Sequence, residues 1–495
     1  MLVAIRFVIV AAPARAQPAP SEPSTTDAAA ANVPRSDDAE REPPDEAERK
    51  PTHELEPLPA YRDQDAVAEP EDARGWEEEP GTEPEDALLF GPRALLFVPN
   101  LALKIAFLPV NALAVVLERH AVVEHTIDLL YNDERTAAIL PALSSQTGYG
   151  FSYGVTAFHE DLFGHDEELS AKAKYGGLYL QGYQVAFNGD HVGGSSVWID
   201  SAVRYEHKPA LLFHGIGDPP SGTGDGTLLD PRAASIATRF RQERFLGLLG
   251  AGLSVGRSPV TKLGPTAVFN HRVFGPEQRD FDEPSLETVY DTALVPGFDE
   301  RLNLLELSFG VVHDSRPRKA LPPSGTYFEA FAGGVVPIDE YSFFHGGVEL
   351  AQHFDLYKQT RVLVLRAALE GVGGEREAIP FTELSRLGGS QTLRGYVQDR
   401  YRDRVAAVAT AEYRYPIHAM LAGAVFVDVG EVGSDLGDLF NPGPFSDWKL
   451  GGGGGFILHG DDDVIVSLEL AYGEAFTLLF STDPLRAFSK RELQL

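Results

Sequence analysis

The sequence contains no cysteine, and basic residues are scarce relative to acidic ones. The absence of cysteine excludes disulfide bonds, thiolate metal sites, cysteine nucleophiles and a lipid anchor on an N-terminal cysteine. With 42 basic and 73 acidic residues, the formal net charge is −31. Because phosphate backbones are bound by clustered Lys and Arg, we expect no nucleic-acid partner.

The chain also lacks a hydrophobic run long enough for a membrane-spanning helix. Between Ala87 and Leu130 the longest uncharged run, Ile105–Leu117, has 13 residues, whereas a spanning helix needs about 20. From Asn111 onward, apolar residues instead recur at three- and four-residue steps, which predicts an amphipathic helix with Asn111 as its cap. We interpret residues 87–147 as a periplasmic amphipathic helical segment.

The N-terminal residues are typical of an exported protein. Arg6 precedes a short apolar run, and Ala14-Arg15-Ala16 has the small-x-small pattern of a cleavage site, so residues 1–16 are a predicted signal peptide. Residues 17–86 contain 22 acidic and 6 basic residues, a net charge of −16, and many prolines. Such a composition predicts a disordered acidic Pro-rich segment. It is either a solvated linker or a lure for a basic partner.

From residue 148 to 482 the hydrophobic period is two, which predicts β-strands. For example, apolar Val203 and Tyr205 alternate with Arg204 and Glu206. We count sixteen such segments, or about 21 residues for each tilted membrane strand and its connection. The predicted fold is all-β: a 16-stranded antiparallel transmembrane β-barrel over residues 148–495, preceded by a short helical segment and a disordered N-terminal region.

The connection lengths predict the orientation of this barrel. With the N-terminus in the periplasm, the long connections 275–300 and 372–403 face outside, as in outer-membrane barrels. In this register the first strand is 151–159, and 233–243 and 245–256 are separate strands. The long connection 207–232 then becomes a periplasmic turn, which is contrary to the rule.

Two Gly-x-Ser-x-Gly sequences, centred on Ser152 and Ser254, are similar to the nucleophile elbow of serine hydrolases. An elbow needs a strand followed by a helix, but both serines lie inside alternating strands, so we interpret them as small lumen-facing residues. His120, Glu124 and His125 lack the spacing of a His-Glu-x-x-His zinc site. We therefore expect no enzyme activity, no catalytic residue, no metal site and no cofactor.

The connection 372–403 contains an arginine flanked by glycines, which suggests a compact tip. The glycines around Arg394 are Gly388, Gly389 and Gly395. Ten residues at about 3.3 Å each allow this tip to reach roughly 30 Å, to the middle of the barrel. Alternation in the next strands places four residues on the lumen side: Glu412, Arg414, Phe426 and Asp428. We predict that Arg394 pairs with Asp428 and Glu412 and holds the loop inside the lumen.

These residues carry a family resemblance. Leu393-Arg394-Gly395-Tyr396 resembles the Val/Leu-Arg-Gly-Phe/Tyr motif in the sixth external loop of the BamA/TamA superfamily of outer-membrane barrels, also called bacterial surface antigens. Phe426-x-Asp428-x-Gly430 is similar to the following strand motif, whose aspartate is a partner of the loop arginine. Asp314-Ser315-Arg316 resembles the Asp-x-Arg turn in the middle of such barrels. The resemblance covers residues 148–488.

The resemblance implies a barrel whose first and last strands pair weakly and part as a lateral gate for substrate proteins. Related assembly proteins recruit substrates with periplasmic POTRA domains. Their strand-helix-helix-strand-strand pattern does not occur before this barrel, so we expect a member without POTRA domains. The family's last strand normally ends on an aromatic residue, whereas here Phe488 is followed by Ser489–Leu495.

We therefore predict an outer-membrane protein with its N-terminal segment in the periplasm. Its expected partners are outer-membrane lipids and unfolded outer-membrane client proteins, and its expected role is protein insertion or translocation. Two alternatives are a passive channel or structural surface antigen without assembly activity, and a lipid-active enzyme.

Overall fold

A computed structural model of the chain describes residues 130–481, apart from 166, 223–226, 257–258, 300, 318–319, 339, 442, 444–446 and 461–463. The predicted signal peptide, the acidic segment and the amphipathic helix before Leu130 lie outside the described residues. None of the helices in the described part is long and apolar enough to cross a membrane.

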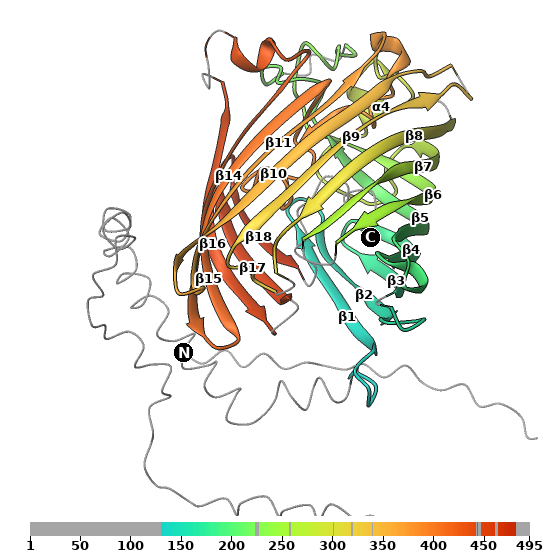
Figure 1. The fold of residues 1–495 in the computed structure, drawn as a ribbon. Helices are drawn as coiled ribbons and strands as arrows, with labels where there is room; N and C mark the ends of the chain where they lie inside the picture. Colours follow the sequence, from blue (N-terminus) through green and yellow to red (C-terminus); the bar gives the residue numbers. More distant parts are fainter. Residues whose placement is uncertain are drawn as a thin grey trace, which may run out of the picture. The chain divides into compact units, whose positions relative to one another are not determined.

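The described residues form a closed barrel of sixteen antiparallel strands, which confirms the barrel part of the predicted fold (Figure 1). In chain order the strands are β1 (Ala137–Gln146), β2 (Gly150–His159), β3 (Glu168–Gly176), β4 (Tyr179–Gly189), β5 (Val197–Phe213), β6 (Thr238–Val255), β7 (Val260–Gly275), β8 (Arg301–Asp314), β9 (Gly325–Val336), β10 (Phe344–Tyr357), β11 (Arg361–Gly373), β14 (Val405–His418), β15 (Leu421–Gly433), β16 (Lys449–His459), β17 (Val464–Tyr472) and β18 (Phe476–Ser481). Each strand pairs with its neighbours in this order, and β1 pairs with β18.

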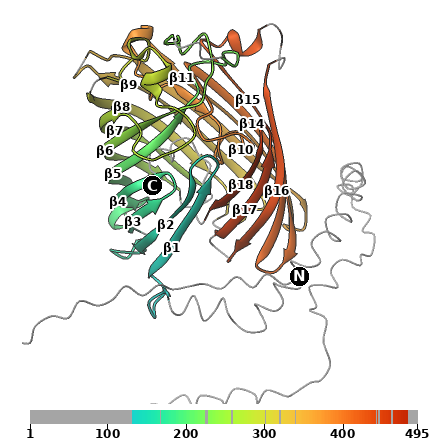
Figure 2. The same ribbon diagram turned by 180° about the vertical axis from the view of Figure 1, so that it is seen from behind.

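The other elements lie in the connections between barrel strands. A small hairpin, β12 (Ser385–Leu387) with β13 (Tyr401–Asp403), lies between β11 and β14. The helical elements of the described residues are single turns: η2 (Val192–Gly194), α4 (Leu286–Val289), η3 (Thr292–Leu294), η4 (Arg376–Ala378) and η5 (Asp438–Phe440). The long connections gather at one end of the barrel, at the top of Figures 1 and 2. We call this end the loop rim and the opposite end the turn rim.

The predicted number of strands is correct only because two errors cancel: one strand was missed and another was counted as two. The first strand is β1 (137–146), so the barrel begins before the predicted boundary at residue 148, inside the segment expected to be helical. The segments 233–243 and 245–256 are not two strands but parts of one long strand, β6. With β1 included, the connection between β5 and β6 lies at the loop rim. The predicted long turn 207–232 at the opposite end was therefore wrong, and no exception to the connection rule is needed.

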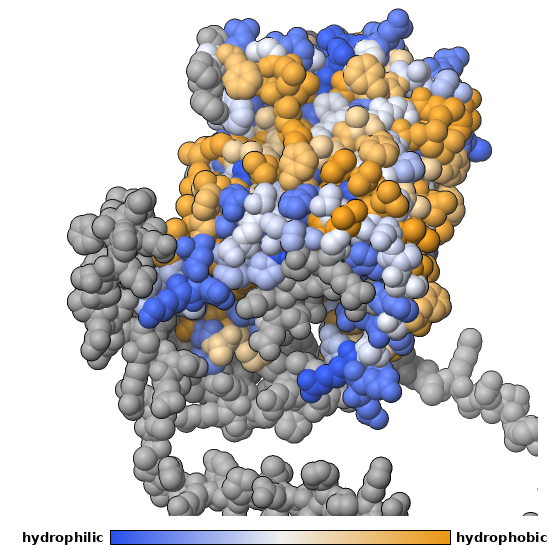
Figure 3. All heavy atoms as spheres, in the orientation of Figure 1, coloured by the Kyte–Doolittle hydropathy of each residue, from blue (hydrophilic) through white to orange (hydrophobic). Residues whose placement is uncertain are grey.

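The two faces of each strand differ as the period-two pattern predicted. On β5 the Val203 side chain is 54% exposed on the outer face, whereas Arg204 and Glu206 are 1% and 0% exposed in the lumen. Figure 3 shows hydrophobic side chains over much of the outer wall, and hydrophilic ones at the rims and in a band across the middle of this face. This distribution suits a wall that faces lipid, because apolar surface there needs no protein cover.

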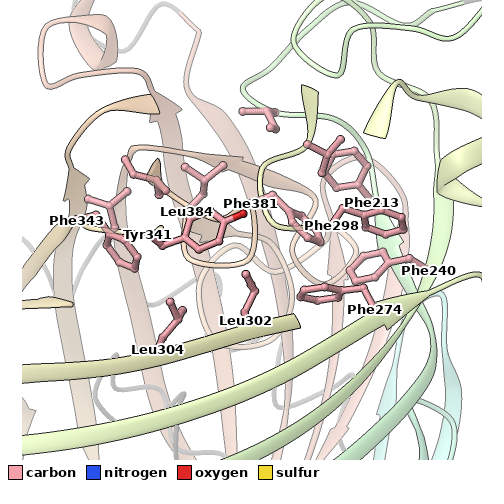
Figure 4. Packing of buried hydrophobic residues seen from close by; sticks show 14 of the residues in the cluster. Phe213, Phe240, Phe274, Phe298, Leu302, Leu304, Tyr341, Phe343, Phe381 and Leu384 are labelled. Carbon is pink, nitrogen blue, oxygen red and sulfur yellow. The ribbon is translucent and has the colours of Figure 1, made fainter. Parts of the chain in front are cut away.

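A hydrophobic core lies near the loop rim, where the connections meet the strand ends (Figure 4). At its centre is Phe381, which comes from the connection between β11 and β14. Its ring centroid lies 5.3–6.0 Å from four other rings, an arrangement that we call the aromatic cluster: Phe213, Phe240, Phe274 and Phe298. Rings at these separations gain attraction beyond their burial, so the cluster fastens this connection to the barrel wall.

A charge placed on the outer wall should test whether this wall faces lipid. Leu249 lies midway along β6 and is 59% exposed. We expect Leu249→Arg to destabilise the barrel in lipid vesicles by about 2–4 kcal/mol, because an arginine near the bilayer midplane loses its hydration. The measurement is denaturant unfolding of the refolded protein. Leu294→Arg, on an exposed residue of the β7–β8 connection, is the control, and an equal effect of both changes would contradict a lipid-facing wall.

Candidate functional site

The connection between β11 and β14, residues 374–404, runs back into the barrel, and we call it the arginine loop. Beyond the β12–β13 hairpin its tip is buried, with Leu393 at 0% and Arg394 at 2% exposure. Leu393 belongs to a hydrophobic cluster with Ala406 and Val408 of β14. The tip therefore lies against the inner face of the barrel wall, as its length allowed.

Arg394 forms a two-point ion pair with Asp428 on β15. Its Nε donates to Oδ2 at 2.7 Å, and its Nη2 donates to Oδ1 at 2.8 Å. The backbone N–H of Arg394 also donates to Oδ2, at 3.2 Å. Because the guanidinium fork matches the carboxylate in plane and spacing, this pair fixes the orientation of the loop tip as well as its position.

Two further carboxylates surround the same guanidinium. Nη1 of Arg394 donates to Glu412 of β14 at 3.0 Å and to Glu469 of β17 at 3.4 Å. A second cation, Arg414, donates from Nε to Glu412 at 2.8 Å. The network therefore joins the loop to three different strands. Arg394 binds all three acids, and Glu412 binds both arginines.

The surroundings of Arg394 favour its charged form. Its guanidinium carbon lies 3.2 Å from the ring centroid of Phe426, a cation–π contact on one face. Burial alone would lower the pKa of Arg394, but the charges of Asp428, Glu469 and Glu412 outweigh burial, so the pKa is raised. A permanently charged arginine among acids is stable only while all partners stay in place.

Two glycines provide the space that this docking requires. Gly395 has φ +91°, and a Cβ there would strike the backbone of Gly473 in the β17–β18 turn. On β16, a Cβ at Gly451 would overlap the carbonyl oxygen of Arg394. Any larger residue at either position would push the loop tip off the wall. The glycine run of β16 thus accommodates the loop.

The structure brings the predicted site residues together around the loop tip. Gly388 and Gly389 follow β12, and the N–H of Gly389 donates to the carbonyl of Tyr396 at 3.2 Å, which closes the tip. Tyr396 donates its hydroxyl to the carbonyl of Leu450 at 3.2 Å. Gly430 leaves room for the side chain of Leu387, which would lie 3.1 Å from a Cβ.

Sequence reasoning did not identify Glu469 or Gly451 as members of this site. A signal existed for Glu469, since it is an acid between the outward-facing Leu468 and Leu470 of β17. Nothing in the local sequence separates Gly451 from the four glycines that follow it.

The arginine loop also contacts the turns on both sides of the β1–β18 contact. On one side the carbonyl of Gly395 accepts from the N–H of Glu474 at 3.0 Å, and Arg400 pairs with the Glu474 carboxylate at 2.9 Å. On the other side Val397 packs against a cluster that includes Tyr149 of the β1–β2 turn and Leu212 of β5. One loop therefore bridges two hairpins that lie far apart in sequence.

The serines of the two Gly-x-Ser-x-Gly sequences lie inside strands β2 and β6, and no helix follows either strand directly. The hydroxyl of Ser152 donates to the carbonyl of Gly176 at 3.0 Å and accepts from the N–H of Leu178 at 3.3 Å. Ser254 is 1% exposed. Within the described part of the chain, no group of three His, Asp or Glu side chains could hold a metal ion.

Comparisons with known proteins give one family match. A family profile described as "Omp85 superfamily domain" matches residues 161–459, which is more than half of the chain. No curated protein sequence matches the chain significantly.

Solved structures of three barrel proteins are also similar. BamA from Haemophilus ducreyi lacking POTRA domains 1–3 has 15% identity and a TM-score of 0.47, with 70% of each chain covered. CdiB from Acinetobacter baumannii has 11% identity and a TM-score of 0.44, and CdiB from Escherichia coli has 11% and 0.47. The match covers 70% of this chain in both cases but only 59% and 61% of the two CdiB chains.

Removal of the arginine should release the loop. We expect Arg394→Ala to destabilise the barrel by about 3–5 kcal/mol, because Asp428, Glu412 and Glu469 would be left near one another without their main counter-charge. The measurements are the heat-induced shift in gel mobility and the rate at which protease cuts the loop. Arg386→Ala is a matched control, because Arg386 pairs with Asp399 in the same loop but is partly exposed, where a pair contributes about 1 kcal/mol or less. Wild-type behaviour of Arg394→Ala in both assays would contradict the role of the network.

Proposed function

Since the chain belongs to the Omp85 superfamily of outer-membrane barrels, as its motifs predicted, we propose that it inserts proteins into the bacterial outer membrane or translocates them across it. The client enters the membrane through the contact between β1 and β18, which we call the seam. The expected partners are therefore unfolded outer-membrane proteins and the lipids around the barrel wall.

The observation that carries this proposal is the short pairing at the seam. Within the described residues, β1 and β18 pair only at Ser144 with Ser481 and at Ser145 with Phe480. In contrast, β1 pairs with β2 along its whole length, from Ala137 with His159 to Gln146 with Gly150. Among the residues that the structure describes, which end at Ser481 on this strand, the seam has fewer paired residues than any other strand pair of the barrel wall, and we therefore place the proposed opening at this contact.

We further propose that the arginine loop holds the seam closed at the loop rim. Arg394 fixes the tip to β14, β15 and β17, while Gly395 and Arg400 contact the β17–β18 turn. On the other side, Val397 packs against the cluster that contains Tyr149 of the β1–β2 turn. Parting of the two hairpins would break one of these sets of contacts, so the state of the loop and the state of the seam are coupled.

The proposed orientation follows the connection lengths. The loop rim faces the cell exterior, and the turn rim and the N-terminal segment face the periplasm. In this proposal residues 1–16 are a cleaved signal peptide, and the acidic segment 17–86 and the helical segment that follows it lie in the periplasm. No catalytic role is proposed, since the Ser152 hydroxyl is used in backbone hydrogen bonds.

A crosslink across the seam should abolish the proposed activity. Because the chain has no cysteine, Ser144→Cys with Ser481→Cys introduces a single possible disulfide. We expect the oxidised protein to lose client insertion in reconstituted vesicles and to regain it on reduction. Ser144→Cys with Ser152→Cys, a pair on the permanently joined strands β1 and β2, serves as the control and should insert clients in both states. Full activity of the oxidised seam variant would refute a lateral route.

Conductance separates this function from a passive channel. The arginine loop and the hydrophobic core near the loop rim occupy space that an open pore would need. We expect the purified barrel to show only small conductance steps in a planar bilayer, while depletion of the protein in cells lowers outer-membrane protein levels. Large, long-lived steps together with unchanged outer-membrane protein levels would instead support the channel.

A further inference from the structure

A small pocket at the loop rim is lined by three arginines that are not part of the Arg394 network. Arg232 comes from the β5–β6 connection, and Arg376 and Arg404 come from the arginine loop. The remaining lining residues are Ile216, Pro296, Ile379, Leu384 and Asp403. Three connections therefore meet at one cationic pocket on the surface.

These three arginines differ from Arg394 because they form no close ion pair among the described residues. Among the described residues, none of their guanidinium groups forms an ion pair with a carboxylate within 4.0 Å. Arg404 donates from Nη2 to the carbonyl of Gly374 at 3.3 Å, and its buried Nε has no acceptor. The pocket therefore contains guanidinium donors that remain available to a ligand.

The lining of the pocket contains more basic than acidic residues. Asp403 is its single lining acid, and it accepts from the backbone N–H of Arg404 at 2.8 Å. Three arginines face one aspartate in the lining, and Asp230 and Glu377 also act on Arg232 from outside it. Partial burial and the neighbouring charge of Arg376 lower the pKa of Arg232. Crowded cations of this kind are stabilised by a bound anion.

The pocket is held in shape by the core beneath it. Ile216, Ile379 and Leu384 belong to the same hydrophobic core as the aromatic cluster. The carbonyl of Pro296 accepts from the N–H of Phe381 at 2.9 Å, which joins two of the three connections. The core therefore fixes the apolar floor of the pocket.

We propose that this pocket binds a phosphate monoester. The planar guanidinium groups match phosphate oxygens in two-point hydrogen bonds, and three arginines together offer enough donors for the oxygens of one phosphate. The phosphate belongs either to a lipid of the surrounding membrane leaflet or to a soluble molecule. This site is independent of the seam, so the binding test and the crosslinking test can fail separately.

Binding to the full-length protein in detergent tests this site. The probes are inorganic phosphate, lipid A carrying both phosphates, and dephosphorylated lipid A, each titrated calorimetrically. We expect inorganic phosphate or phosphorylated lipid A to bind, and dephosphorylated lipid A not to bind. Binding of inorganic phosphate indicates a soluble source, and selective binding of phosphorylated lipid A indicates the membrane; either outcome supports the site.

Substitutions locate the binding. Arg376 is exposed and forms no side-chain hydrogen bond among the described residues, so Arg376→Gln should fold normally. We expect Arg376→Gln and Arg404→Gln each to weaken binding at least about tenfold, or ~1.4 kcal/mol. Arg301→Gln removes the same charge from an exposed residue at the same rim, outside the pocket lining, and should bind like the wild type. The proposal is overturned if no phosphorylated probe binds the wild type, or if Arg376→Gln and Arg404→Gln bind it with unchanged affinity.

Discussion

The ion-pair network around Arg394 depends on the closure of the barrel, and the position of the arginine loop depends on this network. Its acids come from β14, β15 and β17, and the lumen side of all three strands converges only when the sheet is curved. Arginine with a single buried acid would gain little over its lost hydration. Three acids and an aromatic face together replace the water that Arg394 gives up, and Arg414 offsets part of the acidic charge by pairing with Glu412.

The barrel separates its apolar and charged residues in a way that assigns a role to each surface. Outward side chains such as Val203 and Leu249 are exposed on the outer wall, while lumen side chains such as Arg204 and Glu206 pair with one another in an enclosed interior. A conventional hydrophobic core forms only near the loop rim, where the connections rise above the wall and Phe381 inserts between other rings. The arginine loop is thus fixed at two levels, by aromatic packing near the rim and by charge pairing deeper in the lumen.

Arginine performs two opposite tasks in the same loop. Arg394 is surrounded by carboxylates and holds the loop to the wall, whereas Arg376 and Arg404 line a pocket with a deficit of negative charge. The difference lies in the number of acidic partners and not in burial alone. An arginine whose guanidinium donors all have acceptors stabilises the structure, while one with unused donors can still form hydrogen bonds to a ligand. The seam lies beside Arg394 and its carboxylate partners, so in our proposal the opening of the seam is coupled to the position of the loop tip.

The sequence by itself determined the fold class, the face of each strand and the central pair of the site. Alternation of period two depends only on local chemistry. The pair of Arg394 and Asp428 followed from a glycine-flanked arginine in a long connection, from the alternation in the next strands and from the resemblance of both motifs to a known family. The sequence did not reveal β1 as a strand, because Pro141 and the small residues of this segment give no clear alternation. Its pairing with β2 identifies it as a strand. The length of β6 was also hidden, since its 18 residues exceed the span of a membrane strand and charged residues interrupt its pattern. Only the tertiary structure brought Glu469 and Gly451 to the loop tip, because these residues are distant in sequence and barrel closure alone sets which strands face the same point in the lumen.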